Sequence, residues 1–209
     1  MSTQTQSIKP EEVTDSGSIS TAILLCLIFL SLTGSIATAD WADNLGILSF
    51  AAVGGLALGF AFARFRRLPG FIAHLLNLVL MVPGIATCIT LLLPYELSYT
   101  EKLIILQERI QVWVLRVASG GTGSAALIFV IQLCLIIWLI AYFAAWSVYR
   151  RHQVWGAILP TGLALLINLY YAAPQSGLTF GLYILSAMLL LVRLNLQTME
   201  RHWRGAARP

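Results

Sequence analysis

Three cysteines and three histidines are the residues of this chain whose chemistry could support nucleophilic catalysis or metal binding. They are Cys26, Cys88 and Cys134, together with His74, His152 and His202. A catalytic cysteine needs an accessible thiolate with an imidazole in reach, and a zinc site needs several such ligands at short spacings. Each cysteine instead lies alone within a long apolar stretch, whereas the histidines lie at the margins of such stretches. We therefore expect no catalytic residue, no metal ligand and no cofactor.

Three amide side chains, Asn77, Gln132 and Asn168, are the notable polar groups inside the apolar stretches. An amide in a membrane helix can hydrogen-bond to a neighbouring helix for about 1 kcal/mol, so we interpret all three as packing contacts. No Asp, Glu or Lys occupies the middle of any stretch. Ion-coupled transporters usually need such charges, and a small transporter or channel is therefore the weakest functional hypothesis.

Six long apolar stretches must position these side chains. They are Thr21–Ala39, Leu45–Ala63, Phe71–Leu93, Ala125–Tyr149, Trp155–Tyr171 and Leu178–Val192. A helix needs about 20 apolar residues to cross a bilayer. The first four stretches meet that length, the last can continue through Leu194 and Leu196, and Trp155–Tyr171 can be extended by its flanking residues. With 58% hydrophobic and 11% charged residues, the chain is predicted to be an all-α, polytopic bundle of six transmembrane helices over residues 19–196.

Basic residues are concentrated in every second gap between the stretches. Ten of the thirteen lie on one side, namely Lys9, Arg64, Arg66, Arg67, Arg150, Arg151, Arg193, Arg201, Arg204 and Arg208. Because basic loops stay in the cytoplasm, both termini are predicted to be cytoplasmic. The net charge of +4 then reflects topology at the lipid bilayer, and it gives no support to nucleic-acid binding.

The two ends of the chain are predicted to be tails. Residues 1–18 are rich in Ser, Thr and Gln and are expected to form a disordered cytoplasmic tail, and residues 197–209 a basic cytoplasmic tail. Ala37-Thr38-Ala39 has the form that signal peptidase recognises, which leaves cleavage before Asp40 as an alternative. The acidic Glu11, Glu12 and Asp15 ahead of the first stretch favour an uncleaved helix.

The external connection 94–124 is the one long loop, and its middle has helical periodicity. One apolar face is formed by Leu103, Leu106, Ile110, Trp113 and Val117. The segment Thr100–Ala118 is too polar to span, so we predict an amphipathic helix in the outer interface. The alternative is a helix that docks another domain or subunit. Residues 119–124 would then form a flexible hinge into the next stretch.

A small-residue motif, Gly55-x-x-x-Gly59 extended by Gly54, lies in the second stretch. Small residues at this spacing line one face of a helix and let a neighbouring backbone approach closely. The motif predicts a packing or partner surface without naming the partner. Among the aromatic residues, Trp138 lies deep within its stretch, so it should face protein.

Several segments resemble a known family. They are Ala141–Arg151, Ala157–Pro174, Leu191–Leu196, Asp40-Trp41, Arg64-Phe65-Arg66 and Ser119–Thr122. Together the chain resembles the N-terminal membrane region of bacterial membrane-anchored transglutaminase-like proteins. In that family a further transmembrane helix leads to an extracytoplasmic papain-like domain with a Cys-His-Asp triad. The triad maps onto no residue here, so the resemblance implies a bacterial plasma membrane module, either a fragment or a stand-alone form, without the activity.

Three functional hypotheses follow. The leading one is a non-catalytic membrane anchor or scaffold that positions an extracytoplasmic transglutaminase-like domain. The second is a structural subunit of a larger membrane complex that packs on partners through the face of Gly54, Gly55 and Gly59. The third is the small transporter or channel.

Overall fold

Seven α-helices make up most of the computed structural model, which describes residues 10–39, 41–65, 67–94, 96–120, 126–171 and 177–206, with side chains between Ile19 and Met199. In chain order they are α1 (Pro10–Ala37), α2 (Leu48–Arg64), α3 (Gly70–Thr90), α4 (Tyr99–Ala118), α5 (Ala126–Arg151), α6 (Trp155–Tyr171) and α7 (Gly177–Ala206), with a short 3-10 turn, η1 (Leu45–Ile47), before α2. The described ranges contain no strand, which confirms the all-α prediction.

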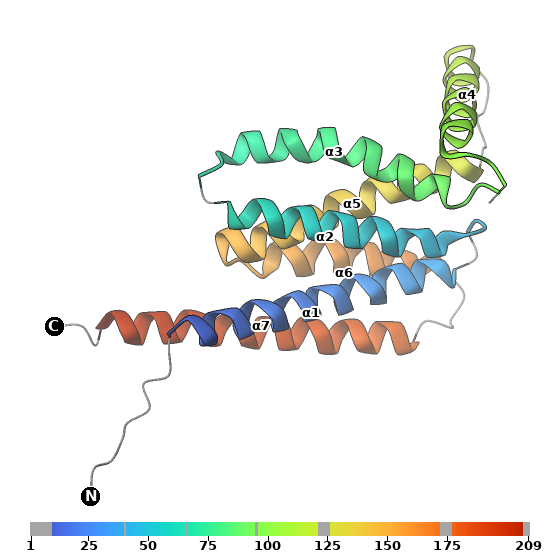
Figure 1. Cartoon of the computed structure of the whole chain (residues 1–209). Coiled ribbons are helices and arrows are strands. Elements are labelled where there is room, and N and C mark those ends of the chain that lie inside the picture. The colour runs from blue at the N-terminus through green and yellow to red at the C-terminus, as the bar shows by residue number, and fades with distance from the viewer. Residues whose placement is uncertain are drawn as a thin grey trace, which may run out of the picture.

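Six of the helices lie side by side along one axis, and α4 lies crosswise at one end of them (Figure 1). The first helix starts and the last helix finishes at the opposite end. We name these two ends the α4 end and the termini end. The most extensive contact is between α2 and α5, followed by the contact between α1 and α7, while α6 packs on α5 and α1. The bundle therefore has α2 and α5 at its centre and α3 and α7 at its edges.

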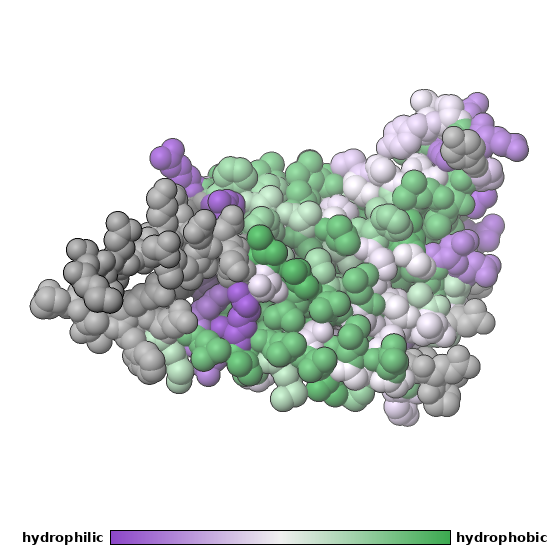
Figure 2. Space-filling model, turned by 60° about the horizontal axis from the view of Figure 1, so that its bottom comes forward, coloured by the Kyte–Doolittle hydropathy of each residue, from purple (hydrophilic) through white to green (hydrophobic). Residues whose placement is uncertain are grey.

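Within the described residues, five helical segments are long and apolar enough to cross a membrane. They are Ile19–Ala37 of α1, Leu45–Arg64 (η1 together with α2), α3, α5 and Gly177–Met199 of α7. Helix α6 is equally apolar, but it has 17 residues and falls below that length. On the face shown in Figure 2, a hydrophobic belt lies between two groups of hydrophilic side chains. A belt of this kind suits a multi-pass membrane protein, because lipid tails rather than water then surround the exposed leucine, valine and phenylalanine side chains.

The helices at the two ends of the chain are longer than predicted. Helix α1 begins at Pro10, within the segment 1–18 that was predicted to be a tail, and helix α7 continues to Ala206. Residues 1–9 and 207–209 lie outside the described residues, as do residues 121–124 of the predicted hinge. Extending an existing helix adds a backbone hydrogen bond for each residue fixed, and proline is favoured at the first position because an N–H there has no helical partner.

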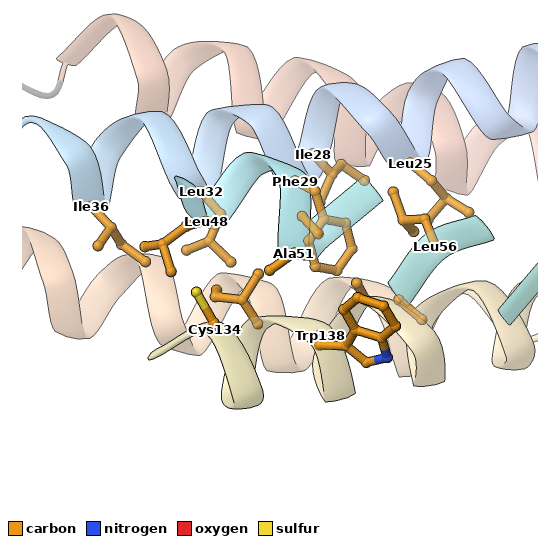
Figure 3. Close-up of a cluster of buried hydrophobic side chains, with 14 of the residues drawn as sticks. Leu25, Ile28, Phe29, Leu32, Ile36, Leu48, Ala51, Leu56, Cys134 and Trp138 are labelled. Atoms are coloured by element: carbon orange, nitrogen blue, oxygen red, sulfur yellow. The ribbon is translucent and has the colours of Figure 1, made fainter. Parts of the chain in front are cut away.

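The buried apolar side chains form a large cluster contributed mainly by α1, α2 and α5, and a smaller one of Ala63, Ala73, Tyr142 and Trp146. Figure 3 shows Leu25, Phe29 and Leu32 of α1 reaching toward Leu56 and Ala51 of α2, with Trp138 of α5 completing the cluster. These side chains are buried. Since no hydrophobic force drives helices together within lipid, the close fit of these side chains is what holds the helices in contact.

Two glycines of α2 bring its backbone against that of α5. A methyl group placed on Gly55 would lie 2.5 Å from the carbonyl oxygen of Trp138 and 2.9 Å from Cβ of Ala141. A methyl group placed on Gly59 would lie 2.5 Å from the carbonyl oxygen of Tyr142. Both separations are below van der Waals contact, so only glycine fits at these positions.

Gly55→Ala should therefore destabilise the protein, and Gly181→Ala, in a helix position with nothing within 4 Å, is the matched control. We expect Gly55→Ala to lower the free energy of unfolding by about 1–3 kcal/mol, because overpacking forces the two backbones apart. The control should change it little or raise it slightly, since alanine is the better helix former. Unfolding in mild detergent by titration with sodium dodecyl sulfate, followed by circular dichroism, measures both. Equal effects of the two substitutions would contradict the close-contact interpretation.

Candidate functional site

The polar side chains buried in the bundle meet one another across helix interfaces. Among the described residues, no buried side-chain nitrogen or oxygen lacks a hydrogen-bond partner. This satisfaction matters more here than in a water-soluble protein, because an unpaired polar group in hydrocarbon costs several kcal/mol. The pairs therefore identify which helices must stay in contact, and they are the strongest candidates for functional groups.

One deeply buried pair joins α3 to α5. The indole N–H of Trp138 donates to Oδ1 of Asn77 over 3.2 Å, and the two side chains are 5% and 1% exposed. The indole ring lies so close to Gly54 of α2 and Gly84 of α3 that a Cβ at either position would overlap it. Trp138 thus faces protein as predicted, and it fills the space that the two glycines leave between three helices.

A second α3–α5 pair lies toward the termini end. Nδ1 of His74 is 2.9 Å from the hydroxyl of Tyr142, which is fully buried, and the imidazole also packs on the rings of Phe143 and Trp146. The imidazole therefore contacts a phenol hydroxyl and aromatic rings. Trp146, which the sequence alone would assign to the membrane surface, is buried within this cluster.

An arginine closes the termini end of the same interface. Arg150 donates from Nη1 to the carbonyl of Phe65 and from Nη2 to that of Leu68, each over 3.1 Å, and its guanidinium lies 5.2 Å from the ring centre of Trp146. The α2–α3 connection is thereby fastened to the last turn of α5. Sequence reasoning missed this role, because Arg150 is more than 80 residues from its partners and reads only as part of a basic loop.

The three amides predicted to pack within the membrane behave differently from one another. Asn77 bonds to Trp138 as described, and Nδ2 of Asn168 donates to Oγ of Ser35 over 2.9 Å, joining α6 to α1. Gln132 is exposed and has no hydrogen bond to another described residue, so its packing role stays a prediction. It lies two residues before Cys134, whose side chain is near the level of Leu48 at the start of α2 (Figure 3). Interfacial water can solvate an amide at that depth.

Further hydroxyl and arginine contacts fasten the edge helices. The hydroxyl of Tyr183 in α7 donates to the carbonyl of Ile158 in α6 over 2.7 Å, and Nε of Arg193 donates to Oγ1 of Thr21 in α1 over 3.2 Å. Thr33 and Ser49 join α1 to α2 through hydroxyls 3.0 Å apart. Each contact lies between helices of this chain, so these groups are engaged in assembling the bundle.

The predicted partner surface of α2 is occupied within the chain. Gly55 and Gly59 face the α5 backbone, and Gly54 faces the ring of Trp138. The close packing expected from the Gly-x-x-x-Gly spacing is therefore present, but its partner is α5 of the same chain. A second subunit has no access to this face while α2 and α5 remain in contact.

Helix α4 begins where a capping box satisfies its first backbone groups. The N–H of Ser98 donates to Oε2 of Glu101 over 2.7 Å, and the Ser98 side chain caps the start of the helix in return. The hydroxyl of Tyr99 lies 3.2 Å from Oγ1 of Thr87, which ties α4 to the end of α3. These contacts hold the first turn of α4, so its direction relative to the bundle is set at Tyr99.

The predicted apolar face of α4 is only partly covered by the bundle. Leu106 is buried, Leu103 and Trp113 are half-buried, and Ile110 and Val117 are exposed. A second apolar group, Ile104, Val112 and Leu115, is exposed by 51%, 54% and 70%. Spacings of eight and three residues put this second group on one side of the helix, away from Leu103, Ile110 and Val117. Helix α4 therefore carries exposed apolar side chains on two sides.

The thiols and imidazoles do not assemble into a reactive site among the described residues. Cys88 and Cys134 are buried in the core cluster and Cys26 is exposed on the bundle surface. Within the same described ranges, no three His, Cys, Asp or Glu side chains are grouped in a way that could hold a metal ion. The chemistry that the arrangement supports is hydrogen bonding between helices.

Comparison of the chain with protein families, with curated proteins and with solved structures finds no match.

A double-mutant cycle should measure the Asn77–Trp138 contact. Asn77→Leu and Trp138→Phe each leave one buried group without a partner, and each should lower the free energy of unfolding by about 1–3 kcal/mol. The double substitution removes both groups, so its effect should fall short of the sum by about 0.5–1.5 kcal/mol. Detergent unfolding titrations provide all three values.

Gln132→Leu is the control for this cycle, since it removes an amide that has no described partner, and it should change stability by less than about 0.5 kcal/mol. Strict additivity of the two core substitutions would show that the bond contributes no coupling.

Proposed function

We propose that the chain is a six-span membrane scaffold with both termini in the cytoplasm, and that it positions an extracytoplasmic domain without catalysing a reaction itself. The observation that carries this proposal is the contrast between the interior and the α4 end. Buried polar groups are used up in contacts between helices, whereas α4 exposes apolar side chains beyond the bundle. A scaffold needs stable contacts between its helices and an exposed surface for a partner. Hydrogen-bonded interior polar groups and exposed apolar side chains on α4 therefore suit a scaffold better than a catalyst or a transporter.

The sixth span of this proposal is α6. At about 1.5 Å per residue its 17 residues extend roughly 25 Å, a little less than the hydrocarbon thickness, and local thinning of the bilayer accommodates such a mismatch at small cost. Helix α6 lies in the bundle beside α5 and α1 and parallel to their common axis (Figure 1). A helix with these neighbours shares their direction, which supports a crossing.

The proposed orientation of the protein in the membrane rests on the distribution of charged residues between its two ends. Arg64, Arg67, Arg150 and Arg151 lie at the termini end, whereas Asp43, Glu96, Glu101 and Glu108 belong to the α4 end. Because basic residues are retained on the cytoplasmic side, the termini end faces the cytoplasm and the α4 end faces outward.

Helix α4 is the part of the scaffold that would contact both lipid and domain. Its crosswise direction at the α4 end matches the plane of the membrane surface when the bundle axis is perpendicular to the bilayer (Figure 1). In that position Leu103, Ile110 and Val117 enter the outer leaflet, as expected of an interfacial helix. Ile104, Val112 and Leu115 then remain on the outer side, and an exposed apolar group of this kind is a contact surface for a second protein domain.

The resemblance of this chain to the membrane region of transglutaminase-like proteins suggests the identity of that domain. We propose a papain-like, transglutaminase-type domain, on the same or another polypeptide. The alternative of a subunit that packs on its complex through Gly54, Gly55 and Gly59 is disfavoured, because α5 covers that face.

Reporter fusions test the topology. A self-labelling tag at the C-terminus should react only with a membrane-permeant dye in intact cells, and a small tag inserted in the 172–176 connection should react with an impermeant dye. These two outcomes require α7 to span from outside to inside, and α6 must also cross if the connection before it is cytoplasmic. An insertion after His152 is the control, and it should be protected from the impermeant dye. Protection of the 172–176 tag would reduce the number of spans and contradict the six-span proposal.

Site-specific photo-crosslinking tests the scaffold function. Benzoylphenylalanine in place of Leu115, on the outer side of α4, should crosslink in cells to a polypeptide that contains a papain-like domain, identified by mass spectrometry. The same probe in place of Met188, which is exposed on α7 within the membrane, should give no such product. Crosslinks from Leu115 that reach only lipid would leave an interfacial helix without a docked domain, and protein crosslinks only from Met188 would favour the structural-subunit alternative.

A further inference from the structure

Basic side chains from two distant segments meet at the termini end. Arg64 ends α2, Arg67 lies in the α2–α3 connection, and Arg150 and Arg151 end α5. The hydrogen bonds from Arg150 to the carbonyls of the connection bring these segments together. Arg64, Arg67 and Arg151 are exposed. The folded chain therefore presents a compact basic patch that neither segment forms by itself.

The first turn of α3 lies beside this patch. The ring of Trp146 lies 3.7 Å from where a Cβ of Gly70 would be, and Trp146 in turn contacts the guanidinium of Arg150. No side chain caps the N-terminus of α3, whose first helical residue is Gly70 after Pro69. The first N–H groups of a helix lack helical acceptors and carry partial positive charge, so they add to the attraction of the patch for an anion.

The acidic residues whose side chains the structure describes lie away from this patch. They are Asp43, Glu96, Glu101 and Glu108, and all of them belong to the α4 end. None of these four carboxylates therefore neutralises the patch. Anionic headgroups are the abundant source of negative charge at a membrane surface, and basic sites between transmembrane helices commonly bind them.

Two aromatic side chains beside the patch favour a lipid over a soluble anion. Phe65, within the α2–α3 connection, is 60% exposed, and Phe71, in the first turn of α3, is 78% exposed. Both lie within a few residues of Arg64 and Arg67 along the chain. A free phosphate makes no favourable apolar contact with a phenyl ring, whereas the acyl chains of a phospholipid pack well against exposed phenyl rings.

We propose that this patch is a binding site for an anionic phospholipid, which deepens the proposed function because it requires the termini end to lie at a bilayer surface. The phosphate of the headgroup is bound by Arg64, Arg67 and Arg151 together with the first turn of α3. Phe65 and Phe71 contact the acyl chains. A bound lipid then links the α2–α3 connection to the end of α5, in parallel with the Arg150 hydrogen bonds.

Native mass spectrometry of the full chain in mild detergent tests the site with phosphatidylglycerol and phosphatidylcholine as probes. The combined substitution R64Q/R67Q/R151Q should weaken phosphatidylglycerol binding about tenfold or more, since each basic residue at a membrane surface contributes about fivefold. K102Q/R109Q/R116Q removes the same charge from α4 and should leave binding unchanged. Phosphatidylcholine should bind weakly to every variant.

Three outcomes would overturn the proposal. They are equal retention of phosphatidylglycerol by both triple variants, equal binding of the two lipids, and full displacement of the lipid by millimolar inorganic phosphate, which would indicate a free-anion site. If the triple variant fails to fold, the single variants Arg67→Gln and Arg67→Lys test the proposal instead. Only Arg67→Gln should weaken phosphatidylglycerol binding, because Arg67→Lys keeps the positive charge. Lipid binding in detergent does not depend on orientation, so a reversed topology in the fusion assay would overturn the proposed function and leave this result intact.

Discussion

The close approach of α2 to α5 is the contact on which the rest of the bundle depends. Gly55 and Gly59 let the α2 backbone reach the carbonyl oxygens of Trp138 and Tyr142, a distance that any side chain at those glycines would prevent. Dispersion between closely packed atoms is the main attraction available to helices in lipid, and it falls steeply with separation. The contact between α2 and α5 also fixes how α5 is rotated about its axis, and this rotation determines which α5 side chains face the other helices. Trp138 is therefore directed at α3, where Gly84 leaves room for its ring and Asn77 accepts its N–H.

Polar contacts then add specificity around this apolar centre. Asn77, His74 and the α2–α3 carbonyls hold α3 to α5, Asn168 holds α6 to α1, and Arg193 holds α7 to α1. In an apolar medium each such bond excludes arrangements that would leave one partner unpaired, although its net stabilisation is only about 1 kcal/mol.

The two ends of the bundle differ in what they offer to their surroundings. The α4 end presents a helix with apolar side chains on two sides and with the acidic residues nearby. The termini end presents arginines, an uncapped helix start and exposed phenylalanines. Aromatic rings also gather near the α4 end, where Trp41 packs on Phe129 and Tyr171. The two ends therefore present chemically different surfaces.

The local sequence pattern was sufficient to predict the helices of this fold, but it was insufficient to predict which helices contact one another. The sequence by itself determined that the chain is all-helical, that most of its helices are long and apolar, and that Thr100–Ala118 forms an amphipathic helix, because hydropathy and periodicity depend on neighbours within a few turns. It also predicted the close packing at Gly55 and Gly59 and the buried position of Trp138. Only the tertiary structure decided that the glycine face meets α5, that Gln132 is exposed while Asn77 and Asn168 are paired, and that Arg150 fastens a connection more than 80 residues away. The physical reason is that one helix face is equally compatible with lipid, a neighbouring helix or another subunit, and the choice depends on how all the helices share one limited interface.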